Sequence, residues 1–358
     1  KKWSSFTGGK HSIAVTSCTS ALHLSLEALG FGEGDEAIVP AFTWISTANV
    51  VEHLRGKVVF CDIDLETFNL DVGQLANLVS SSTKVIIPVH LFGMPVNIEP
   101  IMSLAQDYKL SVVEDAACGF GSRYKGNHVG TFGDTGCFSF HPRKSITTGE
   151  GGAVLTNNPK LKKIIESLRD WGRDCYCKPG DDNTCKKRYD WQLGGLPYGY
   201  DHKYIYSLLG YNLKATDMQA AVGLSQMDKL DSFIMKRKEN FSYLYENFAE
   251  FEEFSLPTWF EKSDPSWFGF PVTIKDNQKI KRLDLLKHYA EHRIGTRLLF
   301  GGNIVLQPAY EKIDLGKSEN FPEANNVSNN SFWLGVYPGL NSEMLKFVVD
   351  STKEFLKK

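Results

Sequence analysis

The sequence is poor in cysteine, in net charge and in long apolar runs. Its 358 residues include only seven cysteines, an odd number and far too sparse for a disulfide scaffold. This usage predicts a reducing, cytoplasmic setting. Lys plus Arg number 40 and Asp plus Glu number 42, which leaves a net charge of −2. Such a balance gives no electrostatic footprint for nucleic acid and no basic anchor for a membrane.

No stretch reaches the roughly 20 apolar residues that a transmembrane helix needs. The longest candidate, residues 85–98, is interrupted by His90, two prolines and Asn97. Apolar residues make up 42% and charged residues 23% of the chain, the balance of an ordinary globular protein. The length predicts about two domains.

Short runs rich in Val and Ile alternate with helical patterns through the first 160 residues. Strands are expected at 37–40, 58–63, 85–89, 111–114, 136–140 and 153–156, and helices at 20–29, 47–54, 72–79 and 98–108. This alternation, with nearly continuous apolar strands, predicts an α/β fold with a mostly parallel sheet covered on both faces.

The second half of the chain has a different pattern. Residues 172–204 concentrate Gly, Asp, aromatic residues and three cysteines, and a structureless stretch of this length predicts a functional loop. The elements expected after it are a long helix at 215–248, strands at 268–274 and 294–300, and helices at 280–292 and 342–356. We predict a large domain over 1–235, with the cysteine-containing insertion 172–204, and a small α+β domain over 236–358.

Two ionisable residues follow predicted strands, where ligands bind in open α/β sheets. Asp115 could pair with a cationic ring nitrogen of a cofactor, or it could cap a helix. Lys144 could form a Schiff base if burial or neighbouring cations lowered its pKa, or it could be an ordinary solvated lysine. Taken alone, the sequence around each residue leaves both of its roles open.

Two further features have the same ambiguity. Thr19 and Ser20 begin an apolar helix, where free N–H groups and the helix dipole can bind a phosphate, although the same residues make plain helix caps. Trp44 follows a strand and could stack on a planar ring or pack in the core. The order of all these features along the chain is far more specific than any one of them.

In this order the motifs resemble the DegT/DnrJ/EryC1/StrS group of sugar aminotransferases, which are fold-type I enzymes dependent on pyridoxal phosphate (PLP). The resemblance covers almost the whole chain and rests on the segments TSCTSALHLSLEALG, PAFTWISTANVV, PVHLFG, VVEDAACGFGS, GTFGDTGCFSFHPRKSITTGEGGAV and GYNLKATDMQAAVGLSQMDKL. It implies a large domain with a mostly parallel seven-stranded sheet and a smaller α+β domain at the C-terminus.

The resemblance also implies roles for individual residues. Lys144 would form the internal aldimine and shuttle the proton, Asp115 would pair with the pyridine nitrogen, and Trp44 would stack on the ring. The other cofactor-binding positions would be Thr19, Ser20 and Ser139 at the phosphate, Cys118 beside the ring hydroxyl, and Asn212 at the phosphate of the partner subunit. The last match implies a homodimer with shared active sites.

Within this group, the segments RDWGRDCYC, GDDNTC and GYDHKY resemble the CDP-4-keto-6-deoxyglucose 3-dehydrase branch. That branch uses pyridoxamine phosphate and a 2Fe-2S cluster, and a histidine replaces its aldimine lysine, whereas this chain keeps Lys144. Three of the cluster-ligand positions are matched, by Cys175, Cys177 and Cys185, but Ala117 stands where the distant fourth cysteine would align. An iron–sulfur cluster, a zinc site and free thiols all stay open for the triplet.

Three functions follow from these observations. The first is an aminotransferase, with L-glutamate as donor and a nucleotide-diphosphate keto-deoxysugar as acceptor, in deoxysugar or lipopolysaccharide biosynthesis. The alternative is a 3-dehydratase that retains a lysine and uses the cluster with an iron–sulfur reductase. The third is a non-catalytic PLP-fold protein. We also expect Arg297 and His202 either to contact a nucleotide diphosphate or to form ion pairs.

Overall fold

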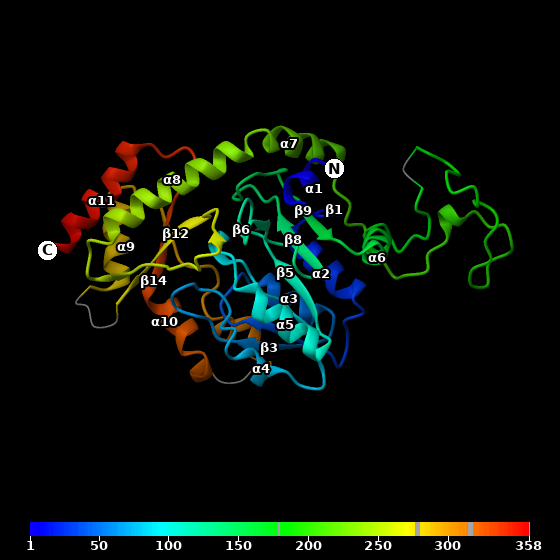
Figure 1. The fold of residues 1–358 in the computed structure, drawn as a ribbon, viewed down its shortest axis with the longest axis horizontal. Helices are drawn as coiled ribbons and strands as arrows, with labels where there is room; N and C mark the ends of the chain where they lie inside the picture. Colours follow the sequence, from blue (N-terminus) through cyan, green and yellow to red (C-terminus); the bar gives the residue numbers. More distant parts are fainter. Residues whose placement is uncertain (178–179, 276–279, 312, 314–317, 358) are drawn as a thin grey trace.

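The computed structural model describes residues 1–177, 180–275, 280–311, 313 and 318–357. A seven-stranded sheet lies at its centre, with strand order β1-β9-β8-β5-β4-β2-β3 (Figure 1). Its strands are β1 (His11–Val15), β2 (Glu36–Pro40), β3 (Lys57–Cys61), β4 (Thr83–Ile86), β5 (Ser111–Asp115), β8 (Thr135–Ser139) and β9 (Gly152–Thr156).

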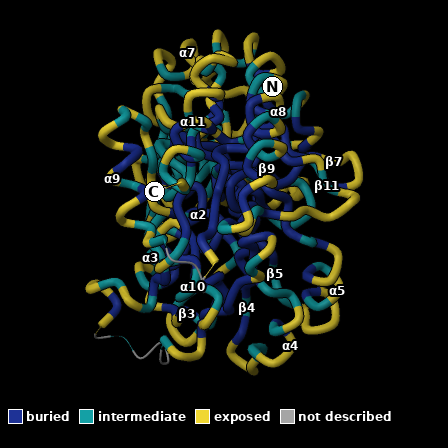
Figure 2. The backbone as a smooth tube through the Cα atoms, turned by 90° about the vertical axis from the view of Figure 1, so that its left-hand side faces the viewer, coloured by how far each residue is buried: buried dark blue, intermediate teal, exposed yellow. Residues whose placement is uncertain are grey.

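The sheet is mostly parallel, which confirms the prediction. Strands β3, β2, β4, β5 and β8 pair in parallel, β9 runs antiparallel to β8, and β1 pairs antiparallel with β9. Strands β8 and β9 are buried at every position, and Figure 2 shows the strands as the dark interior of the molecule. The carboxyl ends of β2, β4, β5 and β8 therefore meet at one edge, together with the end of β1.

Helices cover this sheet, and their starts are set by local capping. The Ser17 side chain accepts a hydrogen bond from the Ser20 amide (3.1 Å) and so begins α2 directly after β1. Asn158 caps α6 in the same way, with Pro159 at its first position. The helices of this part are α1 (Lys2–Thr7), α2 (Cys18–Ala28), α3 (Ser46–His53), α4 (Leu75–Leu78), the 3-10 turn Leu91–Gly93, α5 (Ile98–Tyr108) and α6 (Pro159–Arg169).

The cysteine-containing insertion leaves the body of the molecule after α6 (Figure 1). Among its described residues there is no helix before the 3-10 turn His202–Tyr204, and Arg173 makes only an isolated bridge to Tyr206. The chain then returns to α7 (Asp217–Met227) and α8 (Leu230–Phe248). The single helix expected over 215–248 was therefore wrong, because the helix is interrupted between Met227 and Leu230, where the Leu230 side chain is buried.

A second, antiparallel sheet with the order β10-β12-β14-β13 forms the smaller α+β unit. Its strands are β10 (Phe254–Ser255), β12 (Gly269–Ile274), β13 (Thr296–Arg297) and β14 (Ser331–Gly335), with helices α9 (Arg282–Glu291), α10 (Pro322–Asn330) and α11 (Ser342–Leu356). A small third sheet combines β6 (Arg123–Tyr124), β7 (Asn127–His128) and β11 (Ser263–Asp264), and 3-10 turns occupy Ile304–Leu306, Pro308–Tyr310 and Ser318–Asn320. The strand expected at 294–300 shrinks to two residues.

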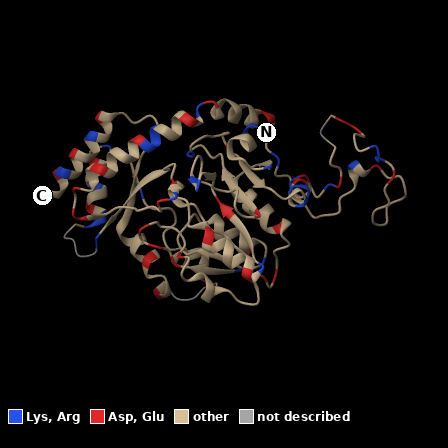
Figure 3. Ribbon diagram, in the orientation of Figure 1, with Lys and Arg blue, Asp and Glu red and all other residues tan. Residues whose placement is uncertain are grey.

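Residues that follow position 235 contribute to the cores of both sheets. Phe241, Phe270 and Phe332 belong to the core of the small sheet, whereas Ile304 and Tyr310 pack in the core of the large sheet. The domain boundary at residue 235 therefore stays a prediction. Charged residues of both signs are spread over the outer helices and the insertion (Figure 3). No helix among the described residues is long and apolar enough to cross a membrane.

Candidate active site

A cavity of about 1260 Å³ lies at the carboxyl edge of the large sheet, between it and the loops of the small unit. Residues from the ends of β2, β5 and β8 line it, together with residues 295–298 and 335–339. The structure brings together most of the side chains that the sequence singled out. Those that line the cavity are Thr19, Trp44, Asp115, Cys118, Ser139 and Lys144.

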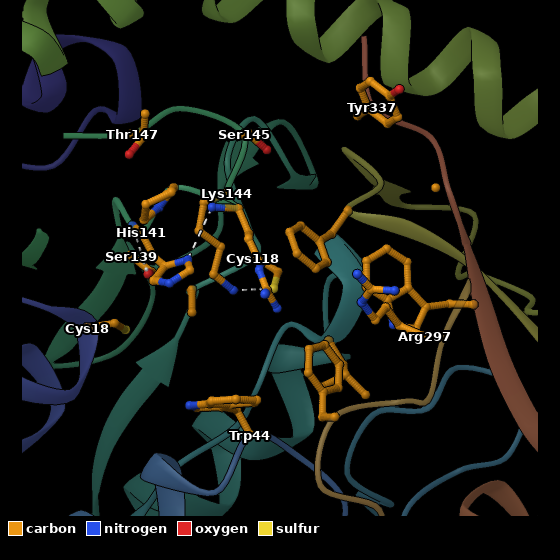
Figure 4. Close-up of a pocket in the computed structure, with 18 of the residues that line it drawn as sticks. Cys18, Trp44, Cys118, Ser139, His141, Lys144, Ser145, Thr147, Arg297 and Tyr337 are labelled. Atoms are coloured by element: carbon orange, nitrogen blue, oxygen red, sulfur yellow. Dashed lines mark hydrogen bonds between the residues drawn. The ribbon is translucent and has the colours of Figure 1, made fainter. Parts of the chain in front are cut away.

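Lys144 comes from the loop after β8 and points into the cavity (Figure 4). Its Nζ donates a hydrogen bond to the Cys118 Sγ (3.0 Å) and lies 4.7 Å from the centre of the Phe268 ring. Burial opposes the ammonium charge, but Cys118, Cys18 and Asp115 together outweigh it and raise the pKa of Lys144. The amine is thus held at a defined place, from which it can attack the carbonyl carbon of a bound ligand.

Asp115 ends β5 and is 4% exposed. One carboxylate oxygen accepts a hydrogen bond from the Thr47 hydroxyl (2.8 Å), and the other accepts one from the Ala117 amide (3.0 Å). Burial raises the pKa of Asp115, and these hydrogen bonds together with the charge of Lys144 act against that rise. A buried carboxylate at the cavity wall suits a cationic group on a bound ligand, because such a partner would relieve its desolvation.

The first turn of α2 and the end of β8 form a small polar cup. Thr19 and Ser139 both line the cavity there. A Cβ atom added at Gly152 would lie 2.4 Å from the Ser17 carbonyl, so the glycine lets the start of α2 pack directly on β9. Hydroxyl groups, the free amides of α2 and its dipole together suit a phosphate. Ser20 lies outside the cavity lining, where its Oγ bonds to Thr16 (2.9 Å) and Ser17 (3.0 Å).

Trp44 and Asn212 differ in position. The Trp44 indole is 57% exposed and lies along the cavity, below Lys144 and Cys118 in Figure 4. Core packing, the alternative interpretation of this tryptophan, is therefore wrong. Asn212 lies outside the cavity lining of its own chain, where it accepts a hydrogen bond from Lys214 (2.8 Å). Its role at a partner's phosphate stays a prediction.

Sequence reasoning missed the cavity residues that come from α8 and the small sheet. Arg237 is 5% exposed, and it donates to the carbonyls of Trp267 (3.4 Å) and Phe268 (3.1 Å). Burial lowers the pKa of Arg237 to about 10, and its Nε has no hydrogen-bond partner. Tyr337 lines the same wall, as does Arg297, which the sequence analysis expects either at a nucleotide diphosphate or in an ion pair. No local motif marks Arg237 or Tyr337, since only the packing of the two units brings them to the cavity.

The cysteine triplet forms a second group of donor atoms, in the insertion. The ligand atoms of Cys175, Cys177 and His202 lie within 4.8 Å of one another, and the Cys185 Sγ lies 3.7 Å from the His202 Nε2. Hydrogen bonds from Thr184 and from the Cys185 backbone lower the pKa of Cys177 to about 6. The structure pairs His202 with the cysteines and not with the central cavity.

The comparisons with known proteins agree with this geometry. The model of the DegT/DnrJ/EryC1/StrS aminotransferase family matches residues 1–353. The chain belongs to this family. It is 46% identical to the lipopolysaccharide biosynthesis protein RfbH of Salmonella typhimurium, over 99% of this chain and 83% of that protein. It is 42% identical to a dTDP-4-dehydro-2,6-dideoxy-D-glucose 3-dehydratase of Saccharopolyspora spinosa, over 99% of this chain and 78% of that one.

One further relative and two solved structures are also similar to this chain. A GDP-perosamine synthase of Escherichia coli O157:H7 is 32% identical over 97% of this chain and 86% of its own. DesV of S. venezuelae superposes with a TM-score of 0.88, at 27% identity over 100% of this chain and 88% of that chain. The E. coli GDP-4-keto-6-deoxy-D-mannose-3-dehydratase, solved with hydrated PLP, gives a TM-score of 0.84 at 25% identity, over 98% of this chain and 89% of that chain. The relatives and solved structures thus include both an enzyme named as a synthase and enzymes named as dehydratases.

Proposed function

We propose that this protein is a PLP-dependent aminotransferase that passes an amino group from L-glutamate to a nucleotide-linked keto-deoxysugar. The observation that carries the proposal is Lys144, whose amine projects into a cavity that also contains a buried carboxylate, Asp115, and the polar cup at α2. The residues present fit PLP, because each part of that cofactor meets a group of matching chemistry. Names of relatives such as GDP-perosamine synthase support the sugar substrate.

When bound, PLP supplies an electron sink for the carbanion that forms next to the transferred nitrogen. Asp115 would hold positive charge at the ring nitrogen, with Thr47 and the Ala117 amide fixing its orientation. Trp44 would cover one face of the ring and exclude water from it. The first turn of α2 and Ser139 would bind the phosphate. Lys144 Nζ would take and return the proton at the reacting carbon.

The size and charge of the cavity support a large anionic substrate. About 1260 Å³ exceeds the volume of most small-molecule sites, which leaves room for a nucleotide sugar beside the cofactor. Arg237 lines this cavity, and its buried Nε has no hydrogen-bond partner. Arg297 is exposed on the same wall. Guanidinium groups pair well with carboxylate and phosphate oxygens, so these two residues are candidates for the donor carboxylate and the diphosphate.

The experiment follows the amino group. The purified protein would be incubated with PLP, L-glutamate and a panel of nucleotide-linked 4-keto-6-deoxysugars, and products would be identified by mass spectrometry. We expect 2-oxoglutarate and a sugar in which an amine replaces the keto oxygen. Lys144→Ala should abolish both products while the exposed Lys160→Ala variant retains them. Unchanged transfer in Lys144→Ala, or no amine with any sugar tested, would reject the proposal.

A second candidate function is a 3-dehydratase dependent on pyridoxamine phosphate and a 2Fe-2S cluster, with an iron–sulfur reductase as partner. Two observations favour it: the grouped cysteines of the insertion and the identity to a relative named as a 3-dehydratase. Lys144 and Ala117 argue against it, because they replace the residues that this branch uses. A product that has lost a hydroxyl and gained no nitrogen would select this candidate.

We also propose that the enzyme is a cytoplasmic homodimer with shared sites. All seven cysteines are free, which suits a reducing compartment. If Asn212 serves the partner's site, co-assembled Lys144→Ala and Asn212→Ala chains would form mixed dimers with one intact site. A random mixture of two inactive variants should then regain about a quarter of the wild-type activity. No recovery in mixed dimers isolated with two affinity tags would contradict the shared site.

A further inference from the structure

His202 is oriented as a ligand. Its Nδ1 lies 3.2 Å from the Lys187 carbonyl oxygen, which can only accept a hydrogen bond, so Nδ1 carries the proton. In a neutral imidazole the Nε2 lone pair is then free, and Nε2 is the atom that faces the Cys185 Sγ at 3.7 Å. A hydrogen bond from Nδ1–H to a backbone carbonyl is the arrangement that orients metal-bound histidines.

The donor atoms have the spacing of ligands around one ion. Zinc sits about 2.3 Å from sulfur and about 2.0 Å from nitrogen in a tetrahedron, which separates neighbouring ligand atoms by about 3.6 Å. The Cys185–His202 distance is 3.7 Å, and the atoms of Cys175, Cys177 and His202 lie within 4.8 Å of one another. Cys185 also contacts the Cys177 side chain, so Cys177 and His202 join the donor atoms of Cys175 and Cys185 into one group.

The arrangement differs from the cluster pattern of the dehydrase branch. Ala117, at the position of the distant fourth ligand, lines the central cavity and has no donor side chain. Cys118, the next residue, is bound to Lys144 in that cavity. The insertion instead supplies its own fourth donor, so its donor set is complete without a residue from the active site.

The insertion also needs a source of stability. Of the residues described between 172 and 206, only Gly172, His202 and Ile205 are buried. A stretch of this size without an apolar core is usually held together by a metal or by disulfides. One ion pair fixes the residue before His202: Asp201 accepts from both Nε (3.0 Å) and Nη2 (2.7 Å) of Arg188. The Trp191 ring packs on the imidazole at 4.9 Å.

We propose that Cys175, Cys177, Cys185 and His202 bind one structural zinc ion that folds the insertion. The site is separate from the chemistry at Lys144, and it stands or falls independently of the proposed transamination. It assigns His202 as a ligand in place of the missing cysteine, and it makes the insertion a metal-stabilised unit and not an electron carrier.

The test measures metal directly on the full chain. Protein purified without chelators would be analysed for zinc, iron and acid-labile sulfide, and its zinc K-edge X-ray absorption would identify the ligands. We expect about one zinc per chain with three sulfur ligands and one nitrogen ligand. Iron with labile sulfide after anaerobic purification would overturn the proposal in favour of a cluster, and protein that binds neither metal would overturn it as well.

Variants separate ligation from general misfolding. Metal-free protein would be titrated with Co²⁺, whose visible spectrum reports tetrahedral thiolate ligation. His202→Ala should weaken Co²⁺ binding by at least about tenfold, whereas the exposed His53→Ala control should bind like wild type. His202→Cys should keep the ion and shift its spectrum to that of four sulfur ligands. Wild-type affinity in His202→Ala, or a spectrum unchanged in His202→Cys, would show that His202 is not a ligand.

Discussion

Glu114 allows a quantitative test of how the end of β5 is held beside Asp115. Its carboxylate is fully buried. One oxygen accepts hydrogen bonds from the Phe132 and Gly133 amides, both at 2.7 Å. The other accepts from the Gly130 amide at 2.7 Å and from the His90 Nε2 at 2.9 Å. All four partners donate, so the site requires an acceptor on both oxygens.

Glu114→Gln keeps the shape and replaces one acceptor by an NH₂ group. Of the two orientations of the glutamine amide, the better one keeps its oxygen on the Phe132 and Gly133 amides. Its NH₂ group then faces the two remaining donors, the Gly130 amide and the His90 Nε2. His90 cannot adapt without cost, because its Nδ1 already accepts from the Val96 amide (3.1 Å). Two hydrogen bonds to a charged acceptor are lost, at about 1.5–3 kcal/mol each. The variant should therefore lose about 3–6 kcal/mol of unfolding free energy.

Equilibrium urea unfolding followed by circular dichroism would measure this difference. The matched control is Glu166→Gln, whose carboxylate pairs with Lys162 one helical turn away on the surface of α6 (3.2 Å). That change should cost less than about 0.5 kcal/mol. If Glu114→Gln were as stable as the control, the carboxylate would not hold these loops, and the reasoning would be refuted.

Three further changes test other parts of the structure. His128 accepts from the Gly121 amide (3.0 Å) and donates to the Val129 carbonyl (2.7 Å), and burial lowers its pKa to about 4. In the unfolded chain this histidine has a pKa near 6.5 and therefore binds a proton at a higher pH than in the folded protein. The free energy of unfolding should then fall by about 3 kcal/mol as the pH drops from 6.5 to 4. A His128→Asn variant that kept this pH dependence would show that His128 is not its cause. Gly152→Ala should weaken PLP binding by at least about tenfold, since its Cβ would displace the start of α2. Unchanged affinity in a fluorescence titration would contradict the proposal that the polar cup at α2 binds the phosphate. Cys118→Ala removes the side chain that contributes most to raising the pKa of Lys144. The cofactor-free variant should therefore capture PLP covalently faster at neutral pH, as stopped-flow absorbance would show, and slower capture would contradict this inference.

Burial on both faces explains which strands the sequence could predict. Strands β8 and β9 are buried throughout and read as continuous apolar runs. Strand β1 escaped prediction because it lies at the edge of the sheet and begins with His11 and Ser12, which are only partly buried. Strand β14 was missed as well, since it follows directly on the polar helix α10. In both cases tertiary pairing, and not local composition, determines the strand.

The residues of the site also differ in whether local sequence or tertiary packing brings them to the cavity. Side chains at strand ends, such as Asp115 and Lys144, could be predicted because parallel strands end at one edge. Arg237 and Phe268 could not, since they reach the cavity only through the packing of the small unit. His202 lies 17 residues from Cys185, across a stretch without regular structure, so no periodicity linked it to the cysteines. Long loops leave no spacing rule from which such a group can be recognised.

Covalent attachment of PLP to Lys144 is the central claim, and borohydride trapping tests it most directly. The PLP-loaded enzyme would be reduced with sodium borohydride, digested and mapped by mass spectrometry, with and without prior addition of L-glutamate. The account predicts a pyridoxyl group on Lys144 alone, which disappears when glutamate is added before reduction. A label on another lysine, or a label on Lys144 that glutamate does not remove, would contradict it.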